Sequence, residues 1–522
     1  MAGRKGRGPG PYLRLWPTVR RVIQPLAVMV FLVLFVWSRR GGWPASVVNA
    51  PMRIDPLAML AHSLASRTLI AGSALALAVV VLTLLLGRVW CGWLCPLGAL
   101  LDWIPLRRWR RKETPVPESW RTVKYGLLLT IVGAAALTNL TLLIFDPLTI
   151  LFRTLSTAVW PAVDQVVSGG ESLLYALPFL RPAVVTFDRV VRPTVLPLDP
   201  AYYRHIMLYA GVFAGVIALN LVASRFWCRY LCPLGALLGL LSKIGLARRE
   251  VTDRCTECGA CSRICPTGTI RRTEGYDSDP GECTMCLECL ESCPEDAIAF
   301  PARAGAPEWA PYDPDRRHLL ASLTASIAGV GLFRSGLLAS RDDPHLVRPP
   351  GARENDLLSK CIRCGECNRA CPTSAIQPAV SEAGLEGLWT PVVVPRAGYC
   401  DYSCNACGQV CPVQAIPPLD LVEKRQRVIG QAYIDEDRCI AWADGTDCIV
   451  CEEMCPVPEK AIVLDEAELP GGGDETRTVQ RPRVIRDLCI GCGICEYKCP
   501  VNGEAAIRVF VPSATGSGTV II

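Results

Sequence analysis

The chain has few histidines and none of the short motifs that mark the common enzyme classes. Four histidines occur among 522 residues, and no C-x-x-C-H sequence is present, which excludes attachment of a c-type haem. A glycine-rich phosphate loop, a flavin or pterin motif and a nucleophile–base set are also missing. The net charge is only +5 and no nucleic-acid-binding motif occurs, so nothing indicates a nucleic-acid partner.

Cysteine, by contrast, is abundant and regularly spaced. All 28 cysteines fall into seven sets of four, and six sets end in Cys-Pro. Four of these have the spacing C-x2-C-x2-C-x3-C-P, which is typical of bacterial ferredoxins that bind a [4Fe–4S] cluster. They are Cys255, Cys258, Cys261 and Cys265; Cys283, Cys286, Cys289 and Cys293; Cys361, Cys364, Cys367 and Cys371; and Cys489, Cys492, Cys495 and Cys499. Two runs with a longer first gap are Cys400, Cys404, Cys407 and Cys411, and Cys439, Cys448, Cys451 and Cys455.

The six runs predict six [4Fe–4S] clusters. Thiolates are the soft ligands that iron–sulfur clusters select, and two-residue gaps let one short loop reach three irons. Disulfides are typical of small secreted domains, and zinc sites usually consist of two separated C-x2-C pairs. Both alternatives therefore fit six such runs poorly.

The fourth cysteine of a run usually binds the cluster of a partner run. Because the first two runs are neighbours, we expect them to exchange Cys265 and Cys293. The last four runs form two further pairs, which are either sequential or nested. We expect the nested arrangement, in which the third run pairs with the sixth, although the spacing does not decide between the two.

Four apolar segments in the first 245 residues are long enough to cross a bilayer. They are approximately residues 22–37, 69–86, 125–145 and 206–223. Basic residues gather before the first segment, between the second and third, and after the fourth, and loops rich in Lys and Arg stay in the cytoplasm. The loops 40–67 and 146–204 are then expected on the outer side.

Two stretches of this apolar part repeat one another. RVWCGWLCPLGALL at 88–101 returns as RFWCRYLCPLGALL at 225–238, and an Asp-Pro-Leu turn precedes each. Parallel repeats relate two halves by an axis along the membrane normal, which brings four cysteines to one depth. These cysteines form either a seventh metal, cluster or thiol site, or a structural turn with small buried side chains. They are Cys91, Cys95, Cys228 and Cys232.

Ionisable residues near the outer edge are candidate proton acceptors. Asp55 and Asp146 open the two Asp-Pro-Leu turns, where ionisable groups of membrane proteins tend to be functional. A turn or helix cap explains them equally well. His62 and His205 fall near the same boundary, where either contacts a quinone, ligates haem or, the interpretation we favour, is an interfacial histidine.

A fifth apolar segment, 319–338, lies between the second and third runs. The preceding Arg316 and Arg317 resemble a twin-arginine export signal, although Leu319 and Leu320 replace the usual Phe-Leu. As a fifth span, the segment places the last four clusters outside the cell. As a cytoplasmic linker helix, it keeps all six inside. We expect export.

These motifs resemble known ferredoxins. Residues 1–300, with their two CxxxCPLGALL units and two following runs, resemble the NapH/NosR/MauN group of membrane ferredoxins. Residues 312–510, with RRHLL, CIRCGECNRACP, the long-gap runs and CIGCGICEYKCP, are similar to NapG, an exported four-cluster ferredoxin. The chain thus resembles a fusion of two quinol dehydrogenase subunits. The fusion departs from the family pattern, so the nitrate pathway of that family is not carried over.

The resemblance implies a membrane-bound protein that oxidises quinol and relays electrons through [4Fe–4S] clusters to a redox partner, either a cytochrome or a reductase. The membrane quinone pool is its other partner, and Asp55 and Asp146 are the candidate quinol proton acceptors. Two alternatives stay open: a redox-sensing or maturation accessory protein for a partner reductase, and a polyferredoxin that delivers cytoplasmic electrons to quinone. Whether the chain is an enzyme also stays open.

The expected fold class is an α-helical membrane domain of four or five spans joined to α+β bacterial ferredoxin-like domains. We expect a membrane domain at 1–245, a two-cluster domain at 246–302, a signal-like helix at 312–340, a linker at 341–356 and a four-cluster domain at 357–515. The expected location is the cytoplasmic membrane, with 246–302 in the cytoplasm and the last domain on the periplasmic side.

Overall fold

The computed structural model describes residues 15–39, 44–104, 116–192, 195–196, 201–302, 316–334, 343–470 and 476–512. Most of the N-terminal basic residues, the basic loop 107–112 and the first residues of the predicted linker 341–356 lie outside these ranges. The chain divides into two compact units. The first comprises Met1–Trp37, Ser46–Phe152 and Ala210–Gly331, and the second Ser38–Ala45, Arg153–Tyr209 and Leu332–Ile522.

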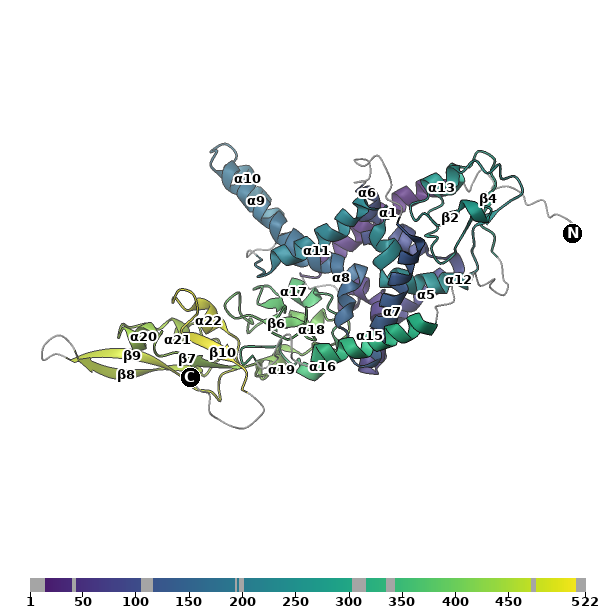
Figure 1. Ribbon diagram of the computed structural model, residues 1–522. Helices are drawn as coiled ribbons and strands as arrows, with labels where there is room; N and C mark the ends of the chain where they lie inside the picture. Colours follow the sequence, from purple (N-terminus) through teal and green to yellow (C-terminus); the bar gives the residue numbers. More distant parts are fainter. Residues whose placement is uncertain are drawn as a thin grey trace. The chain divides into compact units, whose positions relative to one another are not determined.

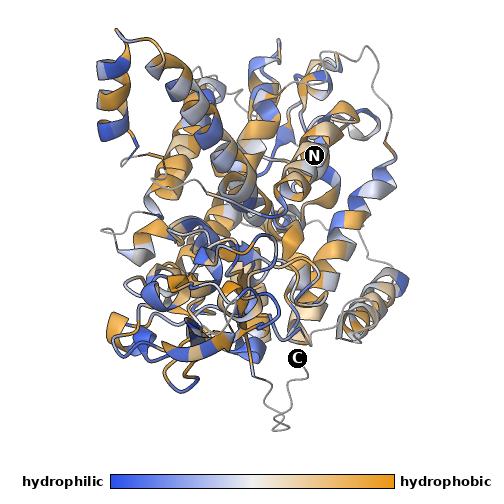
Figure 2. Ribbon diagram, turned by 90° about the vertical axis from the view of Figure 1, so that its left-hand side faces the viewer, coloured by the Kyte–Doolittle hydropathy of each residue, from blue (hydrophilic) through white to orange (hydrophobic). Residues whose placement is uncertain are grey.

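Apolar helices make up most of the first unit (Figure 1). They are α1 (Trp16–Trp37), α2 (Ala45–Val48), α3 (Ala50–Arg53), α4 (Pro56–Ser66), α5 (Ala74–Leu86), α6 (Pro96–Trp103), α7 (Arg121–Ala136), α8 (Pro147–Thr154), α11 (Ile206–Ala218), α12 (Pro233–Lys243) and α15 (Arg316–Arg334). Shorter turns are η2 (Ala71–Ser73), η5 (Glu118–Trp120), η6 (Thr141–Phe145), η8 (Leu219–Leu221) and the two π turns η3 (Trp90–Leu94) and η9 (Trp227–Leu231). Figure 2 shows hydrophobic residues along most helical ribbons.

Helix α1 is apolar on almost all sides. Its mean hydropathy is 2.0 and only 22% of the apolar window is buried. Among the described residues it is the one helix long and apolar enough to cross a membrane. Shorter apolar helices are Ala74–Leu86, Ile206–Leu221, Pro233–Lys243 and Leu320–Leu332. Helix length therefore does not confirm the four-span domain that the sequence predicts.

Two of the predicted segments are shortened by local backbone geometry. In segment 69–86, the turn η2 precedes α5, which leaves a helix of 13 residues. In segment 125–145, α7 ends before Thr138, whose φ of +63° is incompatible with a right-handed helix, and η6 follows. The sequence pattern shows the apolar stretch but not these breaks.

The two-cluster region has a small α+β fold, as the sequence predicts. Strand β1 (Glu250–Val251) pairs antiparallel with β4 (Ile298–Ala299), and β2 (Ile270–Arg271) with β3 (Asp277–Ser278). The short helices α13 (Ala260–Ile264) and α14 (Glu288–Glu291) and the turn η10 (Arg272–Glu274) lie between them. Ile270, Tyr276, Leu290 and Ile298 form a core with the cysteines.

The second unit combines the residues 153–209 with the C-terminal cysteine runs. Its helices are η7 (Leu155–Val159), α9 (Trp160–Tyr175), α10 (Arg181–Val190), α16 (Glu354–Lys360), α17 (Glu366–Ala370), α18 (Ala406–Gln409), α19 (Leu421–Arg425), α20 (Ile440–Ala443), α21 (Val450–Glu453) and α22 (Ile494–Lys498). Its antiparallel strand pairs are β5 (Ile376–Pro378) with β6 (Pro391–Val393), β7 (Gln431–Ile434) with β10 (Ile507–Phe510), and β8 (Ile462–Pro470) with β9 (Thr476–Val484). The sequence predicts this ferredoxin fold but not its association with residues 153–209.

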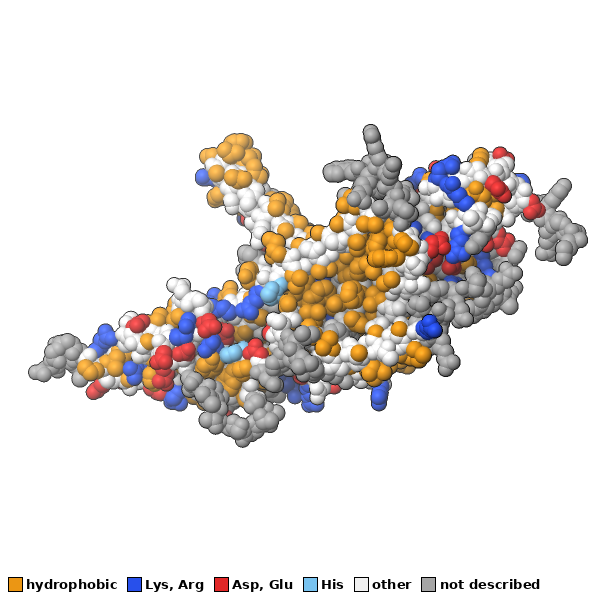
Figure 3. Space-filling view, viewed as in Figure 1, with side chains coloured by type: hydrophobic (Ala, Val, Ile, Leu, Met, Phe, Trp, Pro, Cys, Tyr) orange, Lys and Arg blue, Asp and Glu red, His pale blue; other side chains and the backbone are white. Residues whose placement is uncertain are grey.

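The kinds of side chain at the surface differ between the two units. In Figure 3 the side chains over β8 and β9 are a mixture of acidic, basic and apolar groups, which is ordinary for a surface in water. Orange side chains gather over the helices of the first unit. On α1, the side chains of Val22, Leu26, Met29 and Val30 are each more than half exposed.

Candidate iron–sulfur centres

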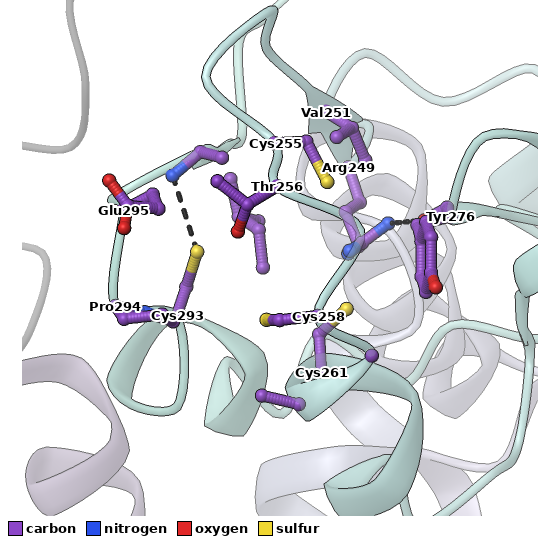
Figure 4. A pocket seen from close by; sticks show the side chains of 14 residues that line it. Arg249, Val251, Cys255, Thr256, Cys258, Cys261, Tyr276, Cys293, Pro294 and Glu295 are labelled. Carbon is purple, nitrogen blue, oxygen red and sulfur yellow. Dashed lines mark hydrogen bonds between the residues drawn. The ribbon is translucent and has the colours of Figure 1, made fainter.

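Four cysteines of the first two runs surround one cavity. Cys255, Cys258, Cys261 and Cys293 line it, together with Arg249 and Tyr276 (Figure 4). Cys293 Sγ accepts a hydrogen bond from the Ala297 N–H at 3.3 Å. We call this set centre 1.

The remaining four cysteines of these runs form a second set, centre 2. Cys265 lies close enough to interact electrostatically with Cys283, Cys286 and Cys289. Cys265 and Cys293 have therefore exchanged places between the runs, which is the grouping that the sequence predicts.

Four further sets occur in the second unit. Centre 3 is Cys361, Cys364, Cys367 and Cys411; centre 4 is Cys400, Cys404, Cys407 and Cys371; centre 5 is Cys439, Cys448, Cys451 and Cys499; centre 6 is Cys489, Cys492, Cys495 and Cys455. Centres 1, 3, 5 and 6 each line a cavity, and the four cavities are of similar size.

The expected nested pairing of the last four runs is wrong, because the runs pair in sequence order. Helix α17 of the third run packs against α18 of the fourth, and α21 of the fifth against α22 of the sixth. The fourth cysteine of each run belongs to the centre of the partner run, which is the run whose short helix packs against the helix of its own run. Closing a short loop costs less chain entropy than closing a long one, which favours pairing with the neighbouring run.

The four regular runs share one backbone conformation. The residues two and four positions after the first cysteine have left-handed φ angles, from +50° to +87°. They are Glu257 and Gly259, Met285 and Leu287, Arg363 and Gly365, and Gly491 and Gly493. Alternation of right- and left-handed residues directs successive N–H groups to one side, which makes a concave site for anionic groups such as iron–sulfur clusters. The cavities and this backbone fit a [4Fe–4S] cluster. The two runs with a longer gap lack the pattern, although all their residues are described.

Proline fixes the direction of the last cysteine. The residue before a proline is restricted to extended backbone. Cys265, Cys371 and Cys499 accordingly have ψ angles of 113°, 115° and 124° and end the short helix that precedes them. This turn carries the fourth thiol away from its own run toward the partner run.

The four C-x3-C-P cysteines converge in the first unit. The thiols of Cys91, Cys95, Cys228 and Cys232 interact electrostatically with one another. Burial raises the pKa of the Cys95 and Cys232 thiols, and the neighbouring thiols raise it further. Each motif is a π turn ended by Cys-Pro, and π turns are frequent at functional sites. The convergence that the repeat predicts is present, whereas the role of the thiols stays a prediction.

The C-x3-C-P turn at residues 91–95 contacts the loop of centre 2. The backbones approach so closely that a Cβ on Gly92 would lie 2.1 Å from the Thr284 carbonyl oxygen. The Trp93 indole N–H donates to the Met285 carbonyl at 2.8 Å. These contacts fix the thiol quartet beside centre 2.

A buried ion-pair network holds the same region together. Arg225 donates two hydrogen bonds of 2.5 Å to Asp102, and Arg20 donates a third. Arg20 also bonds Glu288 on α14 at 2.9 Å. Burial alone raises the pKa of Asp102, but Arg225 and Arg20 outweigh it and hold the pKa below its usual range. Asp102 is thus a charged partner of both arginines.

Replacing Asp102 by Asn should strongly destabilise the first unit. The buried guanidinium of Arg225 loses its carboxylate partner, and that of Arg20 keeps only Glu288. Breaking such a buried pair costs about 3–5 kcal/mol. We expect a lower midpoint in thermal unfolding of the detergent-solubilised protein. In the native chain this contribution is lost as the pH falls below the ordinary pKa of an aspartate, because Asp102 then takes up a proton. Asp465→Asn, which breaks an exposed pair with Arg483, is the control and should leave the midpoint unchanged.

Asp55 and Asp146 form a buried carboxyl pair. Asp55 Oδ1 accepts from the N–H groups of Leu57 and Ala58, and Asp146 Oδ2 from those of Leu148 and Thr149, so each caps a helix. The helix-cap alternative is therefore confirmed.

The other oxygen of each carboxyl has no hydrogen-bond donor among the described residues. The two carboxyl groups lie close enough to influence the pKa of one another. Burial, and then the charge of Asp55, raises the pKa of Asp146 well above its usual range. Burial also raises the pKa of Asp55.

The two candidate histidines differ in their surroundings. His62 is fully buried on α4, and its ring nitrogen lies 3.2 Å from the Ser66 hydroxyl. His205 is exposed. The structure thus gives His62 a hydrogen-bonded place inside the fold, and a contact of either histidine with quinone or haem stays a prediction.

Comparison with known proteins places these centres in a family. A "4Fe-4S binding domain" model matches residues 68–117 and 205–251, a "4Fe-4S dicluster domain" model matches 254–297, and a second "4Fe-4S binding domain" model matches 358–377 and 482–503. The "Methylamine utilization ferredoxin-type protein MauM" of Methylorubrum extorquens is 36% identical over 218 residues, which are 40% of this chain and 94% of MauM. The chain belongs to the MauM/NapG family of ferredoxin-type proteins.

Two other relatives are likewise ferredoxin-type proteins. "Ferredoxin-type protein NapG" of Escherichia coli is 33% identical over 166 residues, 31% of this chain and 69% of NapG. "Ferredoxin-type protein NapH" of the same organism is 28% identical over 310 residues, 55% of this chain and 90% of NapH. The predicted resemblance to a NapH-like chain fused to a NapG-like chain is confirmed. No solved structure matches the chain.

The chain is therefore an iron–sulfur electron-transfer protein of the ferredoxin type. The cysteine spacing predicts the residues of these centres, whereas the charged residues around them are not predicted from the sequence. Arg88 and Arg225 each stand three residues before the first cysteine of a C-x3-C-P motif, and this repetition is the signal that marks them. No comparable signal marks Arg20 or Asp102.

Proposed function

We propose that the chain is a membrane-bound iron–sulfur protein that oxidises quinol and passes electrons through six [4Fe–4S] clusters to a redox partner. The observation that carries the proposal is the combination, in one chain, of six cysteine quartets with helices whose apolar faces are exposed. When bound, the clusters supply one-electron transfer. The side chains hold them, shield them from water and accept the protons that quinol releases.

Exposed apolar side chains support a multi-pass membrane domain. Leu77 and Val81 on α5, and Leu320 and Ile327 on α15, are more than half exposed, which is unfavourable in water but not in lipid. Helix α15 packs on α7 through small residues, and a Cβ on Gly133 would lie 2.7 Å from Ser326 Oγ. Small residues at such contacts are typical of membrane helices. We propose α1, α5, α7, α11 and α15 as the spans.

The contacts of each ferredoxin region support placement on opposite sides of the membrane. Within the first unit, the two-cluster region binds basic residues at the ends of the helices. Lys124 contacts Glu282 at 2.6 Å, and Arg121 contacts the Gly268 carbonyl at 2.7 Å. The ends of membrane-spanning helices that are rich in Lys and Arg usually lie on the cytoplasmic side. Within the second unit, the last four centres belong with residues 153–209, which the charge pattern puts outside.

The carboxyl pair Asp55–Asp146 is the proposed acceptor for the protons of quinol. Both carboxyls are buried and each influences the pKa of the other. We propose that they share one proton, which can move between them without a large rearrangement. The repeat supplies one carboxyl from each half. We propose that quinol binds at this end of the first unit.

The C-x3-C-P thiols are proposed to connect the membrane helices with centre 2, which they adjoin. Replacing both Cys91 and Cys228 by serine should then lower quinol-dependent reduction of centre 2 by tenfold or more and leave its cysteines and its iron in place. The measurement is the rate at which quinol bleaches the visible iron–sulfur absorbance. An unchanged rate would show that the thiols are structural.

The proposed function is tested with purified, detergent-solubilised protein under anaerobic conditions. By iron and sulfide analysis, we expect about one cluster for each of the six centres. We also expect a quinol to reduce these clusters. Clusters that accept electrons only from a cytoplasmic ferredoxin would support a polyferredoxin that reduces quinone. A protein without quinol turnover, whose loss impairs only maturation of a partner reductase, would support the accessory role. A reporter fused after Ile522 tests the side, because a cytoplasmic signal contradicts export of the last domain.

A further inference from the structure

The residues 153–209 cover the loop that carries the third cysteine run. Turn η7 packs against α17, and a Cβ on Gly365 would lie 3.7 Å from Ser156 Oγ and 3.8 Å from Arg153 Cα. The Tyr203 hydroxyl donates to the Asn368 carbonyl at 3.0 Å. This segment therefore shields centre 3 from solvent.

Arg153 is buried in this contact, and no carboxylate of the described residues pairs with it. It is 1% exposed, donates one hydrogen bond of 3.1 Å to the Trp389 carbonyl, and stacks on the Trp389 ring at 4.6 Å. Its Nε and Nη2 groups have no hydrogen-bond acceptor among the described residues. Burying an unpaired charge is costly, so these two groups require an explanation.

The backbone of Trp389 shows that this contact is specifically maintained. Trp389 has a φ of +63°, a left-handed conformation that is unfavourable for a residue other than glycine. Its N–H donates to Ala379 at 2.7 Å, while its carbonyl meets Arg153. The surrounding fold therefore holds the acceptor and the ring in place for the guanidinium.

The cysteine thiols of centre 3 lie close to Arg153. Arg153 interacts electrostatically with Tyr209 and with Cys361, Cys364 and Cys367. It also lies close enough to Arg363 for the two guanidinium charges to interact. A cluster on four thiolates is negatively charged, and its sulfur atoms accept hydrogen bonds.

Other ionisable groups near centre 3 have their own partners. Arg363 donates to the carbonyls of Leu388, Cys361 and Glu386. Arg348 pairs with Glu354. Glu366 is buried and interacts with the charge of Arg369. Arg369 also stacks on Trp160.

Centre 3 also stands at one end of a series. Centres 3 and 4 exchange cysteines, as do centres 5 and 6. The Cys400 N–H donates to the Cys492 carbonyl at 2.8 Å, which joins centre 4 to centre 6. The order of contact is therefore 3, 4, 6, 5, and the end covered by residues 153–209 is centre 3.

We propose that Arg153 raises the reduction potential of centre 3 through its charge and its free N–H groups, so that centre 3 is the first of the four C-terminal centres to accept an electron. Reduction adds negative charge to the cluster, and a buried cation stabilises that state more than the oxidised one. The inference rests on the proposed occupancy of centre 3.

The test is a redox titration of the full chain, followed by electron paramagnetic resonance, for the native protein and three variants. In Arg153→Gln the reduction equilibrium of one cluster should shift by at least tenfold toward the oxidised form, about 59 mV for one electron. Arg153→Lys keeps the positive charge but loses the planar guanidinium that stacks on Trp389, so the shift in the reduction equilibrium should be smaller. Arg181→Gln removes an exposed arginine that stacks on Tyr175, and all its potentials should equal those of the native protein.

The outcomes separate this inference from the proposed function. Native protein without cluster signals contradicts the proposed function itself. Clusters with equal potentials in the native, Gln and Lys forms overturn the role of Arg153. If the Gln form loses a cluster and the Lys form keeps it at the native potential, Arg153 is structural and the inference is wrong.

Discussion

Replacing Cys411 by serine should remove the cluster of centre 3, although Cys411 belongs to the fourth run. Cys411 lines the same cavity as Cys361, Cys364 and Cys367, and a serine hydroxyl is a hard, poor ligand for iron. We expect the loss of one cluster by iron analysis. Its resonance signal should be the one that is missing in Cys364→Ser.

A matched variant distinguishes the two pairings. In the nested arrangement Cys411 would bind with the fifth run, so that Cys411→Ser would lose the same signal as Cys451→Ser. In the sequential arrangement of the structure, Cys499→Ser and Cys451→Ser share a loss instead, because both line the cavity of centre 5. Coincidence of the Cys411→Ser and Cys451→Ser spectra would falsify the sequential pairing.

Asp146→Asn should abolish most quinol oxidation while the protein stays folded. Asparagine is as good a helix cap as aspartate, and its amide can donate to Asp55 in place of the shared proton. The variant therefore mimics the protonated pair and cannot take up the proton of quinol. Loss of a positioned base typically costs 10²–10⁴-fold in rate, and we expect about that decrease in the quinol oxidation rate.

The pH dependence gives this prediction a second measurement. Because burial raises the pKa of Asp146, the pair stabilises the folded chain at low pH, and that contribution is lost as the pH rises through the folded-state pKa. The Asn variant should therefore be more stable than the native protein at alkaline pH. It should also lack the infrared band of the shared carboxylic proton. Asp420→Asn, at the exposed cap of α19, is the control and should change neither rate nor pH profile. If Asp146→Asn oxidised quinol at the native rate, the two carboxyls would act only as helix caps.

The sequence predicts the cysteine centres well because their geometry is local. Two-residue gaps determine a loop with left-handed residues at fixed places, and Cys-Pro determines where the fourth thiol turns, so neighbouring runs such as those of centres 1 and 2 are paired correctly. The pairing of the last four runs depends on which short helices pack together, α17 with α18 and α21 with α22. Spacing carries no information on that packing.

Long-range contacts explain what else the sequence does not show. Arg153 lies more than two hundred residues before Cys361 and Trp389, and it looks like an ordinary loop arginine until the fold brings them together. Hydropathy likewise detects the apolar segments 69–86 and 125–145 but not the turn before α5 or the left-handed Thr138 that shorten their helices. Asp55 and Asp146 show the opposite case, since the repeat marks both and the structure makes them a pair.

The exchange of fourth cysteines also constrains how the protein is made. Neither run of a pair has four thiols for its own cluster until the other run has folded beside it, so cofactor insertion and folding are one event. An unfolded C-terminal domain threaded through a pore would have to acquire iron and sulfide on the far side of the membrane. If the domain is exported as proposed, its biogenesis is simplest when the clusters are inserted in the cytosol and the folded domain is then moved across by a translocase that accepts folded proteins.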